Sequence, residues 1–414
     1  MNISANDKRI LRQLAQTYMD YATLPAQEER RELWRALNGL QMRKPMVAID
    51  QMPWHELDVD GSLVCLVEHP YFRQVEQELR RLIYKWEHLP ADMVLEPYIL
   101  LPRPIRNSGY GLAPEAQRTK YDEKSDVVAR HYENVIQSLE DVEKIAFPQL
   151  TLDREEEAEV LHTAETIFAG IAPVRMQGIT LHLGLWDTVT EWMGVEACYI
   201  ALMEQPELLH AVMERLTQAT LGVIDQVNRL GLQDIHGHLC HCSYTYGELP
   251  SATCDPEHPT TADGWAFGLA QLFTSVSPAV TAEFEVPYMQ RLFPHFGAIY
   301  YGCCDRLDDR LDIITRMPGI RKISCSPWSN RENFAANLPP EYIMSNKPTP
   351  ALLAGDSFDE DAVRADLRRT IEAASRHGLG LEMILKDIST VRYQPQRLWR
   401  WAEIAVEETV RAAL

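Results

Sequence analysis

The spacing of the hydrophobic residues changes after the first forty positions of the chain. The apolar residues that recur at helical intervals there are Ile10, Leu11, Leu14 and Tyr18, followed after Pro25 by Leu33, Leu37 and Leu40. Intervals of three and four residues are typical of one face of a helix. The pattern therefore predicts two helices, which we assign to an N-terminal helical extension over residues 1–44.

From residue 45 onward, short apolar runs alternate with long amphipathic segments. The eight runs are Pro45–Ile49, Leu95–Leu101, Val174–Leu183, Ile235–Leu239, Ala298–Tyr301, Ile320–Ser324, Tyr342–Ser345 and Leu381–Leu385. The segments between them carry helix boundaries such as Pro206 and Gly231, Ser277–Pro278, and the capping box of Ser357 with Glu360. Alternating strands and helices predict an α/β protein with a parallel sheet.

Eight strands in a chain of this length favour a closed (β/α)8 TIM barrel over residues 45–414. The alternative is an open doubly wound sheet. No Gly-x-Gly-x-x-Gly sequence follows an early run, so the glycine turn of a dinucleotide-binding sheet is missing. In a barrel, catalytic residues lie at the carboxyl ends of the strands, and the residues just after each run become the candidates.

Composition narrows the classes of function. The chain has 60 acidic and 40 basic residues and a formal charge of −20, which argues against nucleic acid as a partner. The longest uncharged stretch, 264–282, contains too many polar groups for a membrane span, and the N-terminus lacks a signal-peptide pattern. We expect a cytoplasmic protein with no membrane partner, whose eight cysteines are reduced.

Three clusters carry residues suited to chemistry. The first is the stretch 236–242, where alternation on a strand places His236, His238, Cys240 and Cys242 on one face. These side chains are ligands that zinc prefers, although a loop with core cysteines fits the same letters. We keep His238 as a metal candidate.

The second cluster is the vicinal pair Cys303 and Cys304, preceded by Gly302 at a strand end. A buried pair of small hydrophobic side chains is the plain interpretation. The metal hypothesis is that Cys304 and a carboxylate of the upstream helix, Glu283 or Glu285, bind one ion.

The third cluster is Lys386 with Asp387, directly after the last run. At a barrel mouth these two side chains could act as general acid and base, whereas on an ordinary surface they would form a weak ion pair. Both interpretations stay open at the level of sequence.

Four segments together resemble the uroporphyrinogen decarboxylase superfamily, and within it the zinc-dependent corrinoid methyltransferases. They are Trp186–Pro206, Ser277–Leu292, Ala298–Asp309 and Tyr342–Leu353. The resemblance implies a TIM barrel with one catalytic zinc, and a corrinoid (cobalamin) cofactor carried by a separate protein. It places the family's zinc-binding cysteine on Cys303 or, with a one-residue shift, on Cys304, and it places the family's histidine on Tyr301.

The resemblance also implies roles for individual residues. Some O-demethylating relatives use a glutamate and a histidine as ligands at the separation of Glu283 and Cys304. We therefore expect Glu283, Cys304 and His238 to bind zinc, and Lys386 and Asp387 to handle protons. The substrate-binding residues that we expect to line the mouth are Tyr301, Trp265 and Lys347.

The function expected from the sequence is methyl transfer between a small methylated substrate, of the methoxy or methylamine type, and a corrinoid protein. One alternative is a metal-free, decarboxylase-like lyase that holds a carboxylated substrate through Arg103, Arg106 and Lys386. Another is a non-catalytic, corrinoid-binding barrel. A homodimer is left open.

Overall fold

The main sheet of the protein is parallel. The computed structural model describes residues 1, 3–114, 116–120, 128–237 and 239–413. Seven strands pair side by side in the order β1-β15-β14-β13-β12-β11-β8. Their bounds are β1 Met46–Ile49, β15 Gly380–Leu385, β14 Ile343–Asn346, β13 Ile320–Cys325, β12 Ala298–Tyr301, β11 Trp265–Gly268 and β8 His182–Leu183. The predicted α/β class with a large parallel sheet is therefore confirmed.

Four further strand pairs lie outside this sheet. They are β2 (Ile99–Pro102) with β7 (Val174–Gln177), β3 (Ile105–Asn107) with β6 (Leu150–Leu152), β4 (Ala116–Thr119) with β5 (Ala129–Tyr132), and β9 (Leu239–Cys240) with β10 (Ser243–Tyr244). Only the β2–β7 pair is parallel. Within the described residues, β1 has a ladder with β15 but none with β2, so the paired strands do not form a continuous ring.

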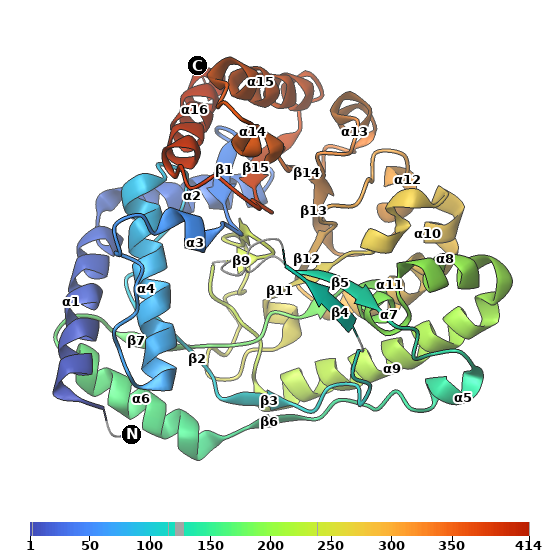
Figure 1. The fold of residues 1–414 in the computed structure, drawn as a ribbon, viewed down its shortest axis with the longest axis horizontal. Helices are drawn as coiled ribbons and strands as arrows, with labels where there is room; N and C mark the ends of the chain where they lie inside the picture. The colour runs from blue at the N-terminus through green and yellow to red at the C-terminus, as the bar shows by residue number, and fades with distance from the viewer. Residues whose placement is uncertain (2, 115, 121–127, 238, 414) are drawn as a thin grey trace.

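Helices surround the curve of the sheet, and the two termini lie on opposite sides of the view (Figure 1). The longer helices are α1 Ala5–Ala22, α2 Pro25–Asn38, α4 Pro70–His88, α6 Arg154–Phe168, α7 Leu185–Met193, α8 Val195–Glu204, α9 Pro206–Leu230, α10 Pro278–Phe284, α11 Val286–Leu292, α13 Arg331–Asn337, α15 Glu360–Arg376 and α16 Gln396–Ala413. Short turns of helix are α3 Trp54–Leu57, α5 Leu139–Val142, α12 Leu311–Ile314 and α14 Ala351–Ala354. Among the described residues, no helix is both long and apolar enough to cross a membrane.

Several predicted helix boundaries agree with the structure. The two N-terminal helices are present as α1 and α2, and α9 runs from Pro206 to Gly231, which caps it in the left-handed conformation at φ 65°. The cap of α15 differs from the prediction. The side chain that accepts the capping hydrogen bond belongs to Asp359 rather than Ser357, because the helix begins later than the Ser–Glu spacing suggested.

One predicted strand is wrong and one real strand was missed. Only the end of the run Ile235–Leu239 is extended, and it forms the β9–β10 hairpin rather than a sheet strand. The chain reverses there because His241 and Cys242 both adopt positive φ, at 43° and 62°. The missing sheet strand is β11, which lies in the uncharged stretch 264–282 that the sequence pattern raised only as a membrane span.

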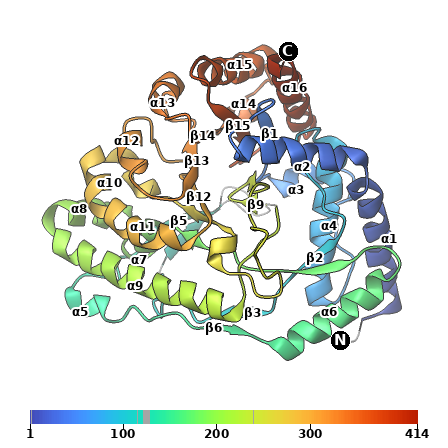
Figure 2. The ribbon, with the colours of Figure 1, turned by 180° about the vertical axis from the view of Figure 1, so that it is seen from behind.

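The two faces of the sheet differ in chemistry. One face belongs to the main apolar core, with Val47, Ile323 and Met344 packed among the surrounding helices. The opposite face carries Lys322 on β13 and Glu382 on β15, both fully buried and joined by an ion pair of 2.7 Å. Figures 1 and 2 both show the β9 hairpin inside the curve of the sheet.

The hairpin is tied to the sheet through that ion pair. The ammonium of Lys322 donates to Ser243 Oγ at 2.7 Å, and the Ser243 hydroxyl donates to Glu382 Oε2 at 2.6 Å. A second hydroxyl, that of Ser345 on β14, donates to Glu382 Oε1 at 2.6 Å. The network fixes the turn that follows Cys240, and with it the position of His241.

Candidate functional site

The ends of β12 and β15 bring two of the predicted clusters together. The strands are parallel, so their carboxyl ends lie at the same edge of the sheet, and Cys303 and Cys304 meet Lys386 and Asp387 there. Gly302 makes the turn out of β12 at φ 90°. A larger residue would be strained at this φ, and its Cβ would lie 3.0 Å from Ser324 Cβ on the neighbouring strand.

The four side chains form one chain of short contacts. Lys386 Nζ donates to Cys303 Sγ at 2.8 Å, the two sulfur atoms are 3.6 Å apart, and Cys304 Sγ donates to Asp387 Oδ2 at 2.9 Å. One ligand atom each from Cys303, Cys304 and Asp387 lies within 4.8 Å of the others. Two sulfur atoms and a carboxylate oxygen therefore converge on a single point at the strand ends.

The surroundings favour a thiolate at Cys303. The contact with Cys304 is the largest influence that lowers the pKa of Cys303, and His241 and Lys386 lower it further. The proximity of Cys303 in turn raises the pKa of Cys304, so this pair holds one proton on Cys304. Burial opposes the charge of Lys386, but the facing Cys242, Cys303 and Asp387 outweigh it and raise the pKa of that ammonium.

The cluster opens into a cavity of about 560 Å³. Its lining residues are Gln51, Thr180, Leu181, His182, Asp187, His241, Phe267, Leu269, Gln271, Cys303, Cys304, Lys386 and Asp387. Thus β8 and β11, with the segments that follow β1, β12 and β15, each contribute to its wall. A volume of this size can hold a small organic substrate above the sulfur atoms.

Asp187 is the carboxyl of this cavity with the most altered acidity. It lies in the first turn of α7, and no hydrogen bond or ion pair joins its carboxyl to another described residue. Burial raises the pKa of Asp187 to about 7, and the charges of Asp305, Cys303 and Glu191 act in the same direction. A carboxyl with this pKa can give or take a proton near neutral pH.

His241 forms one wall of the cavity. Its ring stacks on Phe267, with centroids 3.7 Å apart and an interplanar angle of 6°. Its Nε2 lies 3.0 Å from Lys386 Nζ, and burial lowers the pKa of the imidazole. A neutral imidazole in this place can accept the hydrogen bond of the ammonium.

The expected site residues are distributed over several places. Cys304, Lys386 and Asp387 lie together at the cavity. Glu283 does not line it: its side chain is 59% exposed on α10, with His210 as its ionic neighbour at 3.5 Å. His238 lies outside the described residues.

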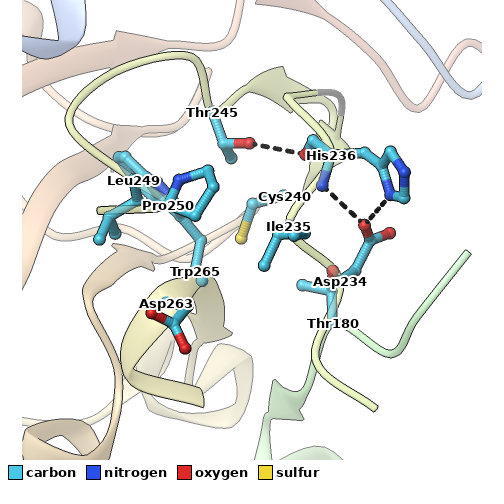
Figure 3. Close-up of a pocket in the computed structure, with 11 residues that line it drawn as sticks. Thr180, Asp234, Ile235, His236, Cys240, Thr245, Leu249, Pro250, Asp263 and Trp265 are labelled. Carbon is cyan, nitrogen blue, oxygen red and sulfur yellow. Dashed lines mark hydrogen bonds and ion pairs between the residues drawn. The ribbon is translucent and has the colours of Figure 1, made fainter. Parts of the chain in front are cut away.

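The three residues expected to bind substrate are buried and do not line the cavity. Tyr301 donates its hydroxyl to Glu285 Oε1 at 3.3 Å, in the layer between sheet and helices. Lys347 is hydrogen-bonded to Tyr300 and Ser345. Trp265 lines a different, much smaller gap (Figure 3).

That smaller gap is lined by His236 and Cys240 of the histidine and cysteine cluster, whereas Cys242 lines another gap beside β1. Figure 3 shows His236 turned toward Asp234, to which its Nδ1 is hydrogen-bonded at 2.7 Å, and away from the sulfur of Cys240. Cys240 and Cys242 are buried, and burial raises the pKa of both thiols. Among the described residues, the cysteines of this cluster do not share a set of metal-binding atoms.

The arginines of the alternative lyase hypothesis also lie elsewhere. Arg103 pairs with Glu157 at 2.6 Å and donates to the carbonyl of Gly231, while Arg106 is exposed beside Asp153. Neither arginine lines the cavity. Its cationic group is that of Lys386.

The sequence analysis assigned proton transfer to Asp387 and zinc binding to Glu283. In the structure it is Asp387 whose carboxylate lies beside the two cysteines. The strand-end rule already indicated Cys303, Asp187 and Asp387, because each follows a predicted strand. The contact between Cys304 and Asp387 spans 83 positions, and no local pattern could have shown it.

Comparison with known proteins supports the fold. A methyltransferase from Methanosarcina mazei superposes with a TM-score of 0.51 at 14% sequence identity, covering 91% of this chain and 97% of that one. At such a low sequence identity, the superposition supports a shared fold but gives no evidence of a shared activity. No family model matches the chain, and no curated protein matches its sequence.

Proposed function

We propose that the cavity at the ends of β12 and β15 is the active site of a metal-dependent methyltransferase, in which Cys303, Cys304 and Asp387 hold a zinc ion. The observation that carries this proposal is the convergence of two thiols and a carboxylate within 4.8 Å at the base of a cavity. The choice of methyl transfer rests on the resemblance of the sequence segments, and the solved structure that shares this fold is named a methyltransferase.

The donor atoms suit zinc in kind and in charge. Zinc prefers thiolate, imidazole and carboxylate ligands, and three protein ligands leave a fourth position for substrate. Two thiolates and one carboxylate carry three negative charges. A divalent ion and the ammonium of Lys386, whose Nζ lies 2.8 Å from Cys303 Sγ, together carry three positive charges that balance them. The same ammonium would stabilise Cys303 as a thiolate while the site is being filled.

Each residue then has a distinct part in the reaction. Bound zinc supplies Lewis acidity that stabilises negative charge on a leaving group. Asp187 faces the cavity from α7 and holds the proton that the departing oxygen or nitrogen needs when its bond to the methyl group breaks. Phe267 and Leu269 give the cavity an apolar wall that keeps water away from the methyl group.

The methyl donor and acceptor follow from the resemblance of the sequence segments. We propose a small substrate of the methoxy or methylamine type and a separate corrinoid protein as the methyl partner. In this proposal the β2–β7 pair fills the place between β1 and β8, and β7 and β8 count as one strand of the run Val174–Leu183. Eight strands then complete a TIM barrel whose mouth faces the corrinoid protein.

The test is a methyl-transfer assay on the full chain with free cob(I)alamin as acceptor. Trimethylamine and a methoxylated aromatic acid serve as donors, and methylation of the cobalamin is followed by absorbance. The zinc-loaded protein should methylate cob(I)alamin from one of these donors, lose this activity on chelation, and regain it with added zinc. Activity that survives complete zinc removal would contradict the proposal.

A further inference from the structure

A second large cavity lies in the region where β1 and β2 separate. Its volume is about 500 Å³, and it shares no lining residue with the cavity above the cysteines. The two cavities are nevertheless adjacent, because Asp50 lines one and Gln51 lines the other. Residues of helix α4 and Tyr244 of the inner hairpin both line it.

The walls combine aromatic rings with aliphatic side chains. Trp54, Tyr98 and Tyr244 contribute rings, while Leu79 and Leu82 of α4 contribute apolar surface. A space of this size with apolar walls and a few polar groups is typical of sites for small molecules, whose volumes run from about 300 to 1,000 Å³. These walls suit a ligand with an apolar body.

The polar groups of the cavity carry both signs of charge. Glu78 and Arg81 lie three residues apart on α4 and both face the cavity, yet neither has a hydrogen bond or ion pair with any residue that the structure describes. The guanidinium of Arg81 is instead held over the ring of Trp54, 4.9 Å from its centroid. Lys85 and Asp50 add a second pair of opposite charges, 4.0 Å apart.

The carboxyl of Glu78 lines the cavity without a partner among the described residues. The residue is exposed, yet the protein atoms packed around the carboxyl desolvate it enough to raise its pKa, although Lys85 and Arg81 act against the shift. A nearby ammonium group favours the charged form of such a carboxyl. Arg81, for its part, presents a planar donor that matches a carboxylate.

We propose that this cavity is a binding site for a free α-amino acid with an apolar side chain. The ammonium group of the ligand pairs with Glu78 and Asp50, the carboxylate pairs with Arg81 and Lys85, and the side chain packs against the aromatic walls. Both charges of the ligand are required, because a simple amine would face Arg81 and a simple acid would face Glu78. This site is independent of the proposed methyl transfer.

The test is isothermal titration of the full chain with L-phenylalanine as the probe. Phenethylamine, which lacks the carboxylate, and 3-phenylpropionate, which lacks the ammonium group, are titrated in parallel. We expect one L-phenylalanine per chain and at least tenfold weaker binding of either half-ligand. Glu78→Gln and Arg81→Gln should each weaken binding of L-phenylalanine at least tenfold, since each leaves one ligand charge without a partner.

Two controls keep the result specific. Glu165→Gln makes the same change at an exposed carboxylate of α6 outside the cavity, and it should leave the binding of L-phenylalanine unaltered. An unchanged circular dichroism spectrum should show that each variant is folded. The proposal is overturned if L-phenylalanine does not bind at concentrations up to about 10 mM. It is also overturned if a half-ligand binds as tightly, or if Asp187→Asn abolishes binding while Glu78→Gln does not.

Discussion

Substitutions of Lys322 and Glu382, which form a buried ion pair, should have strongly non-additive effects on the free energy of unfolding. Both side chains are fully buried, and Lys322 Nζ lies 2.7 Å from Glu382 Oε2. Burial lowers the pKa of Lys322 although Glu382 acts against the shift, whereas Lys322 and Lys347 outweigh burial at Glu382 and lower the pKa of that carboxyl. We take the pair as ionic because its two groups are in direct contact and Glu382 also accepts hydrogen bonds from two hydroxyls. Glu382→Gln or Lys322→Met alone leaves an unbalanced buried charge, which costs about 3–5 kcal/mol of unfolding free energy.

The double variant should be much less unstable than the sum of the single changes. It removes both charges and leaves only the hydroxyls of Ser243 and Ser345 with a weaker acceptor, at a cost of about 1–3 kcal/mol. We therefore expect a coupling energy of at least about 2 kcal/mol. Urea unfolding followed by circular dichroism and by tryptophan fluorescence measures the four proteins of the cycle. Additivity of the two single changes within about 0.5 kcal/mol would refute the reasoning.

Two further predictions concern buried carboxyl groups. If Asp187 donates a proton, the rate of methyl transfer should fall as the pH rises above about 7, and Asp187→Asn should lower the rate about 100-fold and abolish this dependence; an unchanged profile would remove Asp187 from the reaction. Glu285 is fully buried, and burial raises its pKa well above 4.5. Above pH 4.5 the folded protein therefore keeps a proton that the unfolded chain releases, and the free energy of unfolding falls as the pH rises. The Glu285→Gln variant should therefore gain stability relative to the unsubstituted protein, by up to about 1.4 kcal/mol per pH unit above pH 4.5. Urea unfolding at several pH values measures this difference in unfolding free energy. A difference that stays constant with pH would contradict the raised pKa of Glu285.

The sequence predicted the sheet because its strands are short, apolar and separated by well-capped helices. The rule that parallel strands end at one edge was sufficient to bring Cys304 and Asp387 onto the same list of candidates. β11 was missed because its apolar residues continue without charge into the following loop, which hides the boundaries of the strand.

Other features depended on tertiary contacts that no local pattern contains. Glu283 and Glu285 are two residues apart on the sequence, yet the break between α10 and α11 leaves Glu283 on the surface and buries Glu285. Periodicity alone could not decide which of the two points inward. The positive φ of His241 likewise depends on a hairpin turn that the polar stretch around it did not reveal.

The most direct measurement is the metal content of matched cysteine variants. The full chain is loaded with zinc, dialysed and analysed for metal, and a cobalt-loaded sample is examined for thiolate-to-cobalt absorption in the near ultraviolet. Cys304→Ala and Asp387→Ala should each lose the metal and the absorption, because both remove a donor from the cluster at the ends of β12 and β15. Cys240→Ala and Glu283→Ala should retain both. Loss of metal in Cys240→Ala or Glu283→Ala, with full occupancy in Cys304→Ala, would contradict the account.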